Sequence, residues 1–432
     1  MFHSHYKKNF NFLFIKPVWL CSVCFLIIGF ANAQEKENSF QPTFNIYGSG
    51  QIWMRYAEVN PGTTVNGKSI NDFWDISVRR YRLGIKGNLM DKLSYKFLLG
   101  NNNLNTFETT NEPRLLELYI TYSLNEKISI TAGKNPYTGL SRYAAPSSSN
   151  SLGLDVNFAS GPYLNFHDDR YRKLSIAFHG QLGKFDYRAA IAKPANRDKQ
   201  SALSERSQLF YDPQSLNTSA YVKYEFLENE KAGAFTAGTY LGAKDILNLG
   251  AGFMYQTNSS RSINAVGDTL VHDGRSFAID LYYEQKLKNN HSWTLYGAFI
   301  KHDIGPNYLR NIAVDNVVDS SSGIALNGAG TAYAANGTGN IYLFQVGYFR
   351  KFEKVKDRLS GLQGYFQIQY SDLEIIDDPF ALYEAGIHYF LNGQNSKITL
   401  GFQNWAVFLK DENPTTDLRR SMINLMYQFK FN

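Results

Sequence analysis

Three arginines lie close together in the stretch FWDISVRRYRLGIKGNLMDKLSYKFLL, residues 73–99. Arg80, Arg82 and Lys86 share one face of an extended strand, because side chains alternate across a strand. Guanidinium groups present planar donors to the oxygens of an anion, so a row of them can contact and guide anions. The opposite face, which includes Leu83, is apolar. The stretch therefore predicts a β-hairpin between lipid and water, with its basic face toward the water.

Arg79 has the opposite parity from Arg80 and would face lipid on a regular strand. An arginine that faces lipid near the middle of a bilayer costs about 2–4 kcal/mol. A β-bulge inserts one residue and re-aims a side chain. The sequence therefore predicts either a bulge near residues 78–80, which lets both arginines face the lumen, or a position of Arg79 at the membrane interface.

The basic face extends beyond this strand. Arg55 lies opposite Ile52 and Met54 on the preceding strand, and Lys96 alternates with apolar residues on the following one. The candidate pore-lining and anion-binding residues are Arg55, Arg79, Arg80, Arg82, Lys86, Lys96 and Arg142. An alternative stays open, in which each arginine pairs with an acidic residue and braces the wall. The acidic residues considered are Asp75, Glu117, Asp280 and Glu284.

The segment GTTVNGKS, residues 62–69, matches the nucleotide-binding pattern G-x-x-x-x-G-K-[ST]. A working loop of this kind follows a buried strand and opens a helix whose N-terminus holds phosphate. Here Pro61 precedes the segment and another strand pattern, INDFWDISV, follows it. We therefore interpret residues 62–69 as an outer loop that binds no nucleotide.

Other polar residues do not combine into a catalytic or metal site. His167, Asp168 and Asp169 are consecutive and cannot all point at one ion from a strand, so a solvated loop is the better interpretation. Glu384 and His388 share a strand face but lie about 13 Å apart by strand rise, too far for direct catalytic contact. The chain contains no G-x-S-x-G motif. The sequence predicts no enzyme activity, no metal site and no cofactor.

Alternation of apolar and polar residues runs through most of the chain, without a long 3.6-residue period. It predicts an all-β fold, a 16-stranded antiparallel transmembrane β-barrel with short periplasmic turns and long outer loops. The predicted strands cover residues 44–56, 73–86, 93–100, 114–124, 128–135, 171–182, 185–193, 219–227, 246–257, 276–287, 292–303, 340–352, 361–372, 380–391, 396–409 and 418–431. The last strand alternates up to Phe431 and resembles the terminal signal by which bacterial barrels are recognised for assembly.

Three connections need separate treatment. Residues 234–242 could form a seventeenth strand, but this would break the alternation of short and long connections, so we assign 228–245 to an unusually long periplasmic connection. The long loop 136–170 is predicted to be an inward constriction or an outer cap. The loop 304–339, rich in Gly, Ala, Asn and Ser, is predicted to be mobile and surface-exposed.

Residues 1–33 carry three lysines, an apolar run of 15 residues and an A-x-A site before Gln34. This pattern predicts a cleaved secretory signal peptide, whose apolar core is too short to span a membrane. The remaining residues, 34–432, are predicted to form a single barrel domain. Cys21 and Cys24 both lie in the signal segment, so we expect no cysteine chemistry in the mature chain.

Charge and composition limit the kind of partner. Removal of the three signal-segment lysines lowers the net charge from +6 to +3, which does not suit a nucleic-acid binder that relies on bulk attraction. No run of 18 apolar residues follows the signal segment, so helical membrane spans are not expected. The 29 tyrosines and 31 phenylalanines suit strands and the aromatic girdles of a barrel in a lipid membrane.

The hairpin VRRYRLGIKGNLMDKLSYKF resembles the R-R-x-R-L-G-x-x-G-x-L-x-D-x-x-S-Y-K hairpin of the phosphate-selective porin O/P family. The following stretch, residues 115–142, is similar to the next segment of that family and ends in GKNPYTGLSR. The resemblance is specific over about residues 74–145. It implies a 16-stranded, usually trimeric outer-membrane channel whose constriction is lined by arginines for phosphate or polyphosphate. Arg79, Arg80 and Arg82 carry over directly.

The sequence therefore predicts an outer-membrane porin of a Gram-negative bacterium. It would act as a passive diffusion channel for small hydrophilic solutes, with a preference for anions such as phosphate, and would form a homotrimer. One alternative is a surface-exposed binding or adhesion barrel without an open pore. Another is a hydrolase embedded in the barrel.

Overall fold

The computed structural model describes residues 40–107, 112–163, 172–194, 202–230, 233–318, 320–321, 323–352, 358–410 and 418–432. The predicted signal peptide and its boundary with the barrel domain lie outside these ranges, as does the His167-Asp168-Asp169 cluster. No helix in the described ranges is long and apolar enough to cross a membrane.

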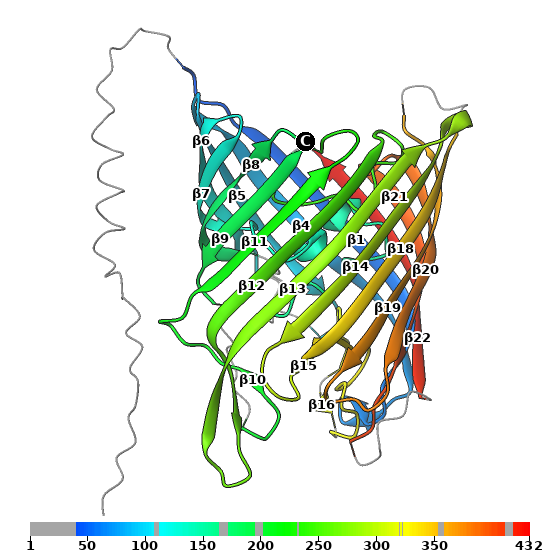
Figure 1. The fold of residues 1–432 in the computed structure, drawn as a ribbon. Coiled ribbons are helices and arrows are strands. Elements are labelled where there is room, and N and C mark those ends of the chain that lie inside the picture. Colours follow the sequence, from blue (N-terminus) through cyan, green and yellow to red (C-terminus); the bar gives the residue numbers. More distant parts are fainter. Residues whose placement is uncertain are drawn as a thin grey trace, which may run out of the picture. The chain divides into compact units, whose positions relative to one another are not determined.

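Sixteen long strands of the described chain form a closed antiparallel barrel (Figure 1). Each strand pairs with the next in this series, and the last pairs with the first, which confirms the predicted fold class. The strands are β1 (Asn45–Glu58), β4 (Asp72–Met90), β5 (Leu93–Leu104), β6 (Arg114–Asn125), β7 (Ile128–Asn135), β8 (Lys173–Leu182), β9 (Phe185–Ala192), β11 (Asn217–Glu225), β12 (Ile246–Ile263), β13 (Thr269–Lys286), β14 (His291–Asp303), β18 (Gly339–Lys351), β19 (Gly361–Leu373), β20 (Phe380–Asn392), β21 (Ser396–Ala406) and β22 (Arg419–Phe431).

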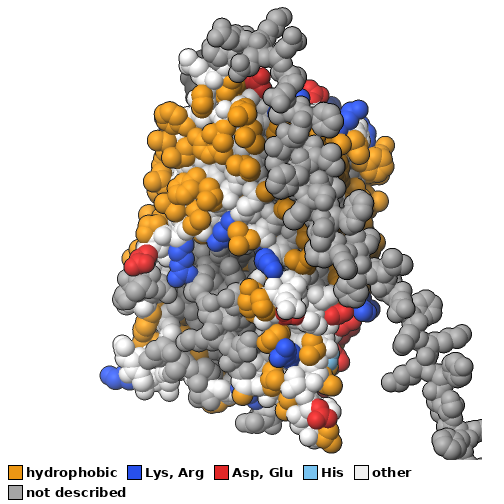
Figure 2. Space-filling model, turned by 90° about the vertical axis from the view of Figure 1, so that its left-hand side faces the viewer, with side chains coloured by type: hydrophobic (Ala, Val, Ile, Leu, Met, Phe, Trp, Pro, Cys, Tyr) orange, Lys and Arg blue, Asp and Glu red, His pale blue; other side chains and the backbone are white. Residues whose placement is uncertain are grey.

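Side chains alternate between the outside and the lumen along each strand. On β1, Ile52 and Met54 are 42% and 48% exposed, whereas the neighbouring Trp53 and Arg55 are buried inside. The same alternation covers much of the outer wall with hydrophobic side chains (Figure 2). An apolar outer surface on a closed barrel is the arrangement that a lipid bilayer requires.

The predicted bulge lies on β4. Gln51 of β1 pairs with Arg80, and Ile52 pairs with Val78, so Arg79 is the inserted residue. Both arginines are buried and point inward, which confirms the prediction. The bulge removes the cost of an arginine in lipid.

The largest difference from the predicted strands is the hairpin of β12 and β13. Its strands continue to Ile263 and begin again at Thr269, where the sequence pattern predicted a loop. This hairpin projects at the end of the barrel opposite the C-terminus (Figure 1). Because the chain termini and the short turns of such barrels lie on the periplasmic side, we assign the hairpin to the outer side.

The first outer loop contains a small hairpin of β2 (Thr63–Val65) and β3 (Lys68–Ser69). Asn66 and Gly67 form its turn, and both have positive φ, as tight hairpin turns require. The nucleotide-binding pattern therefore opens no helix here, which confirms that it is a loop. β2 also pairs with β16 (Ser320–Ser321) from a later outer loop.

Two outer loops fold into the lumen. In the loop between β7 and β8, Leu152, Leu154 and Phe158 are buried, so the inward alternative is confirmed for its described part. The prediction that loop 304–339 is surface-exposed is wrong for its described part, since Val314 and most neighbouring residues are buried. The loop is rich in small residues, which allow its backbone to pack closely inside the barrel. The same composition also suits an exposed loop, so composition alone does not distinguish the two.

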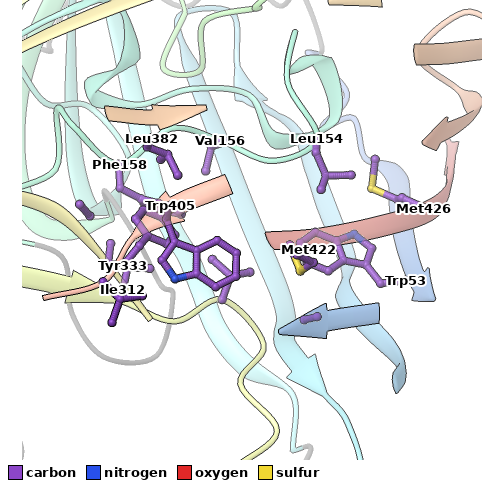
Figure 3. Close-up of a cluster of buried hydrophobic side chains, with 14 of the residues drawn as sticks. Trp53, Leu154, Val156, Phe158, Ile312, Tyr333, Leu382, Trp405, Met422 and Met426 are labelled. Carbon is purple, nitrogen blue, oxygen red and sulfur yellow. The ribbon is translucent and has the colours of Figure 1, made fainter. Parts of the chain in front are cut away.

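Apolar side chains from these loops pack against the inner wall. Trp53 lies beside Met422 and Met426, while Trp405 lies near Phe158 and Leu382 (Figure 3). The lumen therefore has a packed apolar region on the β1–β22 side. Any water-filled path must avoid this region.

Candidate pore and its constriction

The bulged arginines of β4 share one carboxylate. The Arg79 side chain donates to Asp155 at 2.8 and 3.1 Å, and Arg80 Nη1 lies 2.6 Å from the other oxygen of Asp155. Arg80 also donates to Gln51 Oε1 at 3.1 Å. Since Asp155 belongs to the inward loop, the two arginines fasten this loop to the wall.

Arg55 has a similar role on β1, closer than Arg80 to the outer end of the barrel. Its guanidinium donates to Asp75 at 3.2 Å and to the carbonyl of Val314 at 3.0 Å. It also donates to the carbonyl of Asp315, whose side chain accepts from Ser77. Arg55 is 1% exposed, so it braces loop 304–338 inside the barrel.

Three of the predicted residues lie closer to water. Arg82 is half-buried and donates to Asn102 and to two backbone carbonyls, and Lys86 is exposed. Lys86 and Lys96 are direct cross-strand partners. Lys96 Nζ lies 2.8 Å from Glu117.

Arg172, which precedes β8, completes this group. It lies 2.8 Å from the same Glu117 carboxylate and its side chain is 10% exposed. In the described chain Lys86 forms no ion pair and instead lies 5.2 Å from the ring centre of Tyr47. We call Arg82, Lys86, Lys96 and Arg172 the basic patch.

Arg142, the last predicted residue, is buried on the inward loop. It forms a two-pronged ion pair with Glu230 of the connection between β11 and β12, at 2.7 and 2.6 Å. Lys223 and Asn248 also donate to this carboxylate. Burial raises the pKa of Glu230, but Arg142 and Lys223 lower it by more, so the pKa lies well below its usual value.

The acid-pairing alternative is confirmed for two of the four acidic residues considered. Asp75 pairs with Arg55, and Glu117 pairs with Lys96. Asp280 instead accepts from the Arg142 backbone N–H and from two tyrosine hydroxyls. Glu284 accepts two backbone N–H groups of the β11–β12 connection, at Tyr240 and Gly242, both at 2.8 Å.

This connection enters the lumen and meets the inward loop. Pro146 and Thr236 form a parallel β-bridge, and Ser147 N–H donates to the Thr236 carbonyl at 2.8 Å. Gly238 N–H donates to the Asn150 carbonyl at 2.8 Å. We call the two joined segments, Arg142–Asn150 and 233–241, the crossbar.

Residues 44–157 match the model of the family described as Phosphate-selective porin O and P. Over this part the chain is similar to that family. The matched part covers β1 and β4 to β7 together with most of the inward loop, and so includes all seven predicted site residues. No curated protein matches the sequence.

The fold of the chain is similar to that of solved structures. OprB of Pseudomonas putida is 8% identical with a TM-score of 0.55, and the match covers 90% of this chain and 94% of OprB. The channel DcaP of Acinetobacter baumannii is 14% identical with a TM-score of 0.50, covering 92% and 100%. An anion-selective porin from Comamonas acidovorans is 13% identical with a TM-score of 0.49, covering 90% and 100%.

Sequence reasoning missed several lumenal charges of the chain. Arg188 and Lys223 face the lumen from β9 and β11, and strand parity alone could have assigned them. Glu230 lies in an irregular connection, where no periodic signal exists. Among the described residues, no group of three or more His, Cys, Asp or Glu side chains could hold a metal ion.

Proposed function

We propose that this porin is an outer-membrane diffusion channel for small hydrophilic solutes and that it prefers anions such as phosphate. The observation that carries the proposal is the basic patch on the inner wall of β4 and β5. Two lysines stand directly opposite each other there, and like charges in that position destabilise a sheet. Only Glu117 of the described carboxylates pairs with the patch.

The positive charge gives the patch its chemistry. Lys86 is exposed and forms no ion pair within the described residues, while Lys96 and Arg172 share the Glu117 carboxylate. Cations in a narrow lumen attract mobile anions and repel mobile cations. The buried arginines of β1 and β4 add structure rather than free charge, because Asp75, Asp155 and Asp315 surround them.

The remaining parts of the proposal follow from the family and the barrel. We propose export by the N-terminal signal peptide, residence in the outer membrane of a Gram-negative bacterium, and assembly as a homotrimer. The apolar outer wall supports contact with membrane lipid. We propose passive diffusion without catalysis.

A second candidate is a closed surface barrel that binds or adheres through its outer loops. The crossbar and the packed apolar cluster favour this candidate, because both fill the lumen. The projecting β12–β13 hairpin, where Val266 is 81% exposed, would provide an outer contact.

Single-channel recording in planar bilayers separates the two candidates. The diffusion channel predicts discrete conducting steps and a reversal potential in a KCl gradient that indicates anion preference. Absence of steps from correctly inserted protein would favour the closed barrel.

The charge-reversal variant Lys86→Glu then tests the basic patch. We expect the anion-to-cation permeability ratio to fall by about twofold or more. Lys184→Glu, on a short turn at the periplasmic rim, is the matched control and should leave the ratio unchanged. An unchanged ratio in Lys86→Glu would remove the patch from the path.

A further inference from the structure

One aromatic side chain of the crossbar lies directly on the basic patch. The ring of Phe235 lies 5.5 Å from Lys96 Nζ and 5.1 Å from the guanidinium carbon of Arg172. Phe235 is only half-buried and belongs to none of the buried apolar clusters of the described chain. Packing in a hydrophobic core therefore does not account for its place.

The backbone around Phe235 is fixed on both sides. Thr236, the next residue, forms the β-bridge and donates its N–H to the Ala145 carbonyl at 3.1 Å. Further along, Glu284 of the wall accepts the N–H groups of Tyr240 and Gly242. The anchored segment 233–241 therefore holds the ring over Lys96 and Arg172.

Phe235 also borders a small cavity of about 20 Å³, room for about one water molecule, between the crossbar and the wall of β9 and β11. Asp186, Arg188 and Lys223 line that cavity together with Tyr240. The ring therefore separates a charged cavity from the basic patch. Loss of the ring would join the two water-accessible spaces.

We propose that Phe235 is a specificity-determining residue of the channel, which narrows the path and covers the charge of Lys96 and Arg172. This inference rests on the proposed channel function. Cation–π contacts of this kind contribute about 0.5–1 kcal/mol at exposed sites, so the ring holds the two cations without neutralising them. An anion that reaches Lys96 or Arg172 must pass the ring edge.

Single-channel recording of Phe235→Ala tests the inference. We expect conductance to rise by about twofold or more, since removal of the ring widens the path beside Lys96 and Arg172, and anion preference to rise as well. Phe226→Ala is the matched control, because Phe226 opens the same connection but is 50% exposed outside the lumen. Phe226→Ala should behave as wild type.

A second variant separates the effect of Phe235 on the width of the path from its effect on the charge of Lys96 and Arg172. Phe235→Leu keeps an apolar side chain but removes the π face, so conductance should stay near wild type while anion preference rises toward that of Phe235→Ala. If both Phe235 variants match wild type, the inference is wrong and the channel proposal stands. If wild type itself shows no conducting steps, the channel proposal fails first.

Discussion

Arg142 and Glu230 join two segments that enter the barrel from opposite ends. The guanidinium lies on the outer loop between β7 and β8, and the carboxylate lies on the periplasmic connection between β11 and β12. Both side chains are about 1% exposed. A buried, two-pronged ion pair of this kind fixes geometry, because each group depends on the other to remain charged.

Removal of one partner should therefore destabilise the barrel. We expect Glu230→Gln to lower the free energy of unfolding by about 3–5 kcal/mol, since Arg142 is left buried without its counter-ion. The measurement is urea unfolding in detergent micelles, followed by tryptophan fluorescence. The double variant Arg142→Gln/Glu230→Gln should recover part of the loss.

The same connection provides a control for this experiment. Glu228 pairs with Lys286 at 3.3 Å, but both side chains are more than 40% exposed. Glu228→Gln should cost about 0–1 kcal/mol, as exposed ion pairs do. Equal losses in Glu228→Gln and Glu230→Gln would contradict a special role for the buried pair.

Strand parity explains why so much of the wall could be predicted. A period of two residues places Arg55 and Arg80 inward, and the cost of an arginine in lipid predicts the bulge at Arg79. The partners of these residues were beyond sequence reasoning. Asp315 and Glu230 lie in irregular segments, whose position depends on packing between parts of the chain far apart in sequence.

The pH dependence of stability follows from the pKa of Glu230. That pKa is lowered in the folded barrel, so the ionised Glu230 contributes fully to the free energy of unfolding above the ordinary pKa of a glutamate. The contribution is lost only as pH falls through the lower pKa of the folded state. The difference in unfolding free energy between wild type and Glu230→Gln should therefore stay constant from about pH 8 to about pH 5. Urea titrations at a series of pH values measure this difference. A difference that already shrinks between these values would show that the native pKa is not lowered.

The close backbone contact between Gly238 and the inward loop leads to a separate prediction. A Cβ added at Gly238 would lie 2.5 Å from the backbone nitrogen of Leu152, so the two segments would have to move apart. We expect Gly238→Ala to cost about 1–3 kcal/mol and to make single-channel currents noisier. Gly364→Ala is the control, because nothing lies within 4 Å of its added Cβ. Identical urea midpoints for the two variants would show that the segments do not pack this closely.

A disulfide across the β-bridge tests whether the crossbar stays joined while the channel is open. Cys21 and Cys24 fall in the predicted signal peptide, so Pro146→Cys/Thr236→Cys would create the only cysteine pair of the mature chain. Bridged backbones approach closely enough for such a bond. We expect oxidation to leave conductance unchanged in this variant, because the segments are already joined. We expect Glu230→Gln to make single-channel currents noisier, because the crossbar loses its ion pair; oxidation of the cysteine pair in this background should suppress that noise, and reduction should restore it. If oxidation instead abolishes conductance in the otherwise wild-type chain, the open channel requires the crossbar to separate.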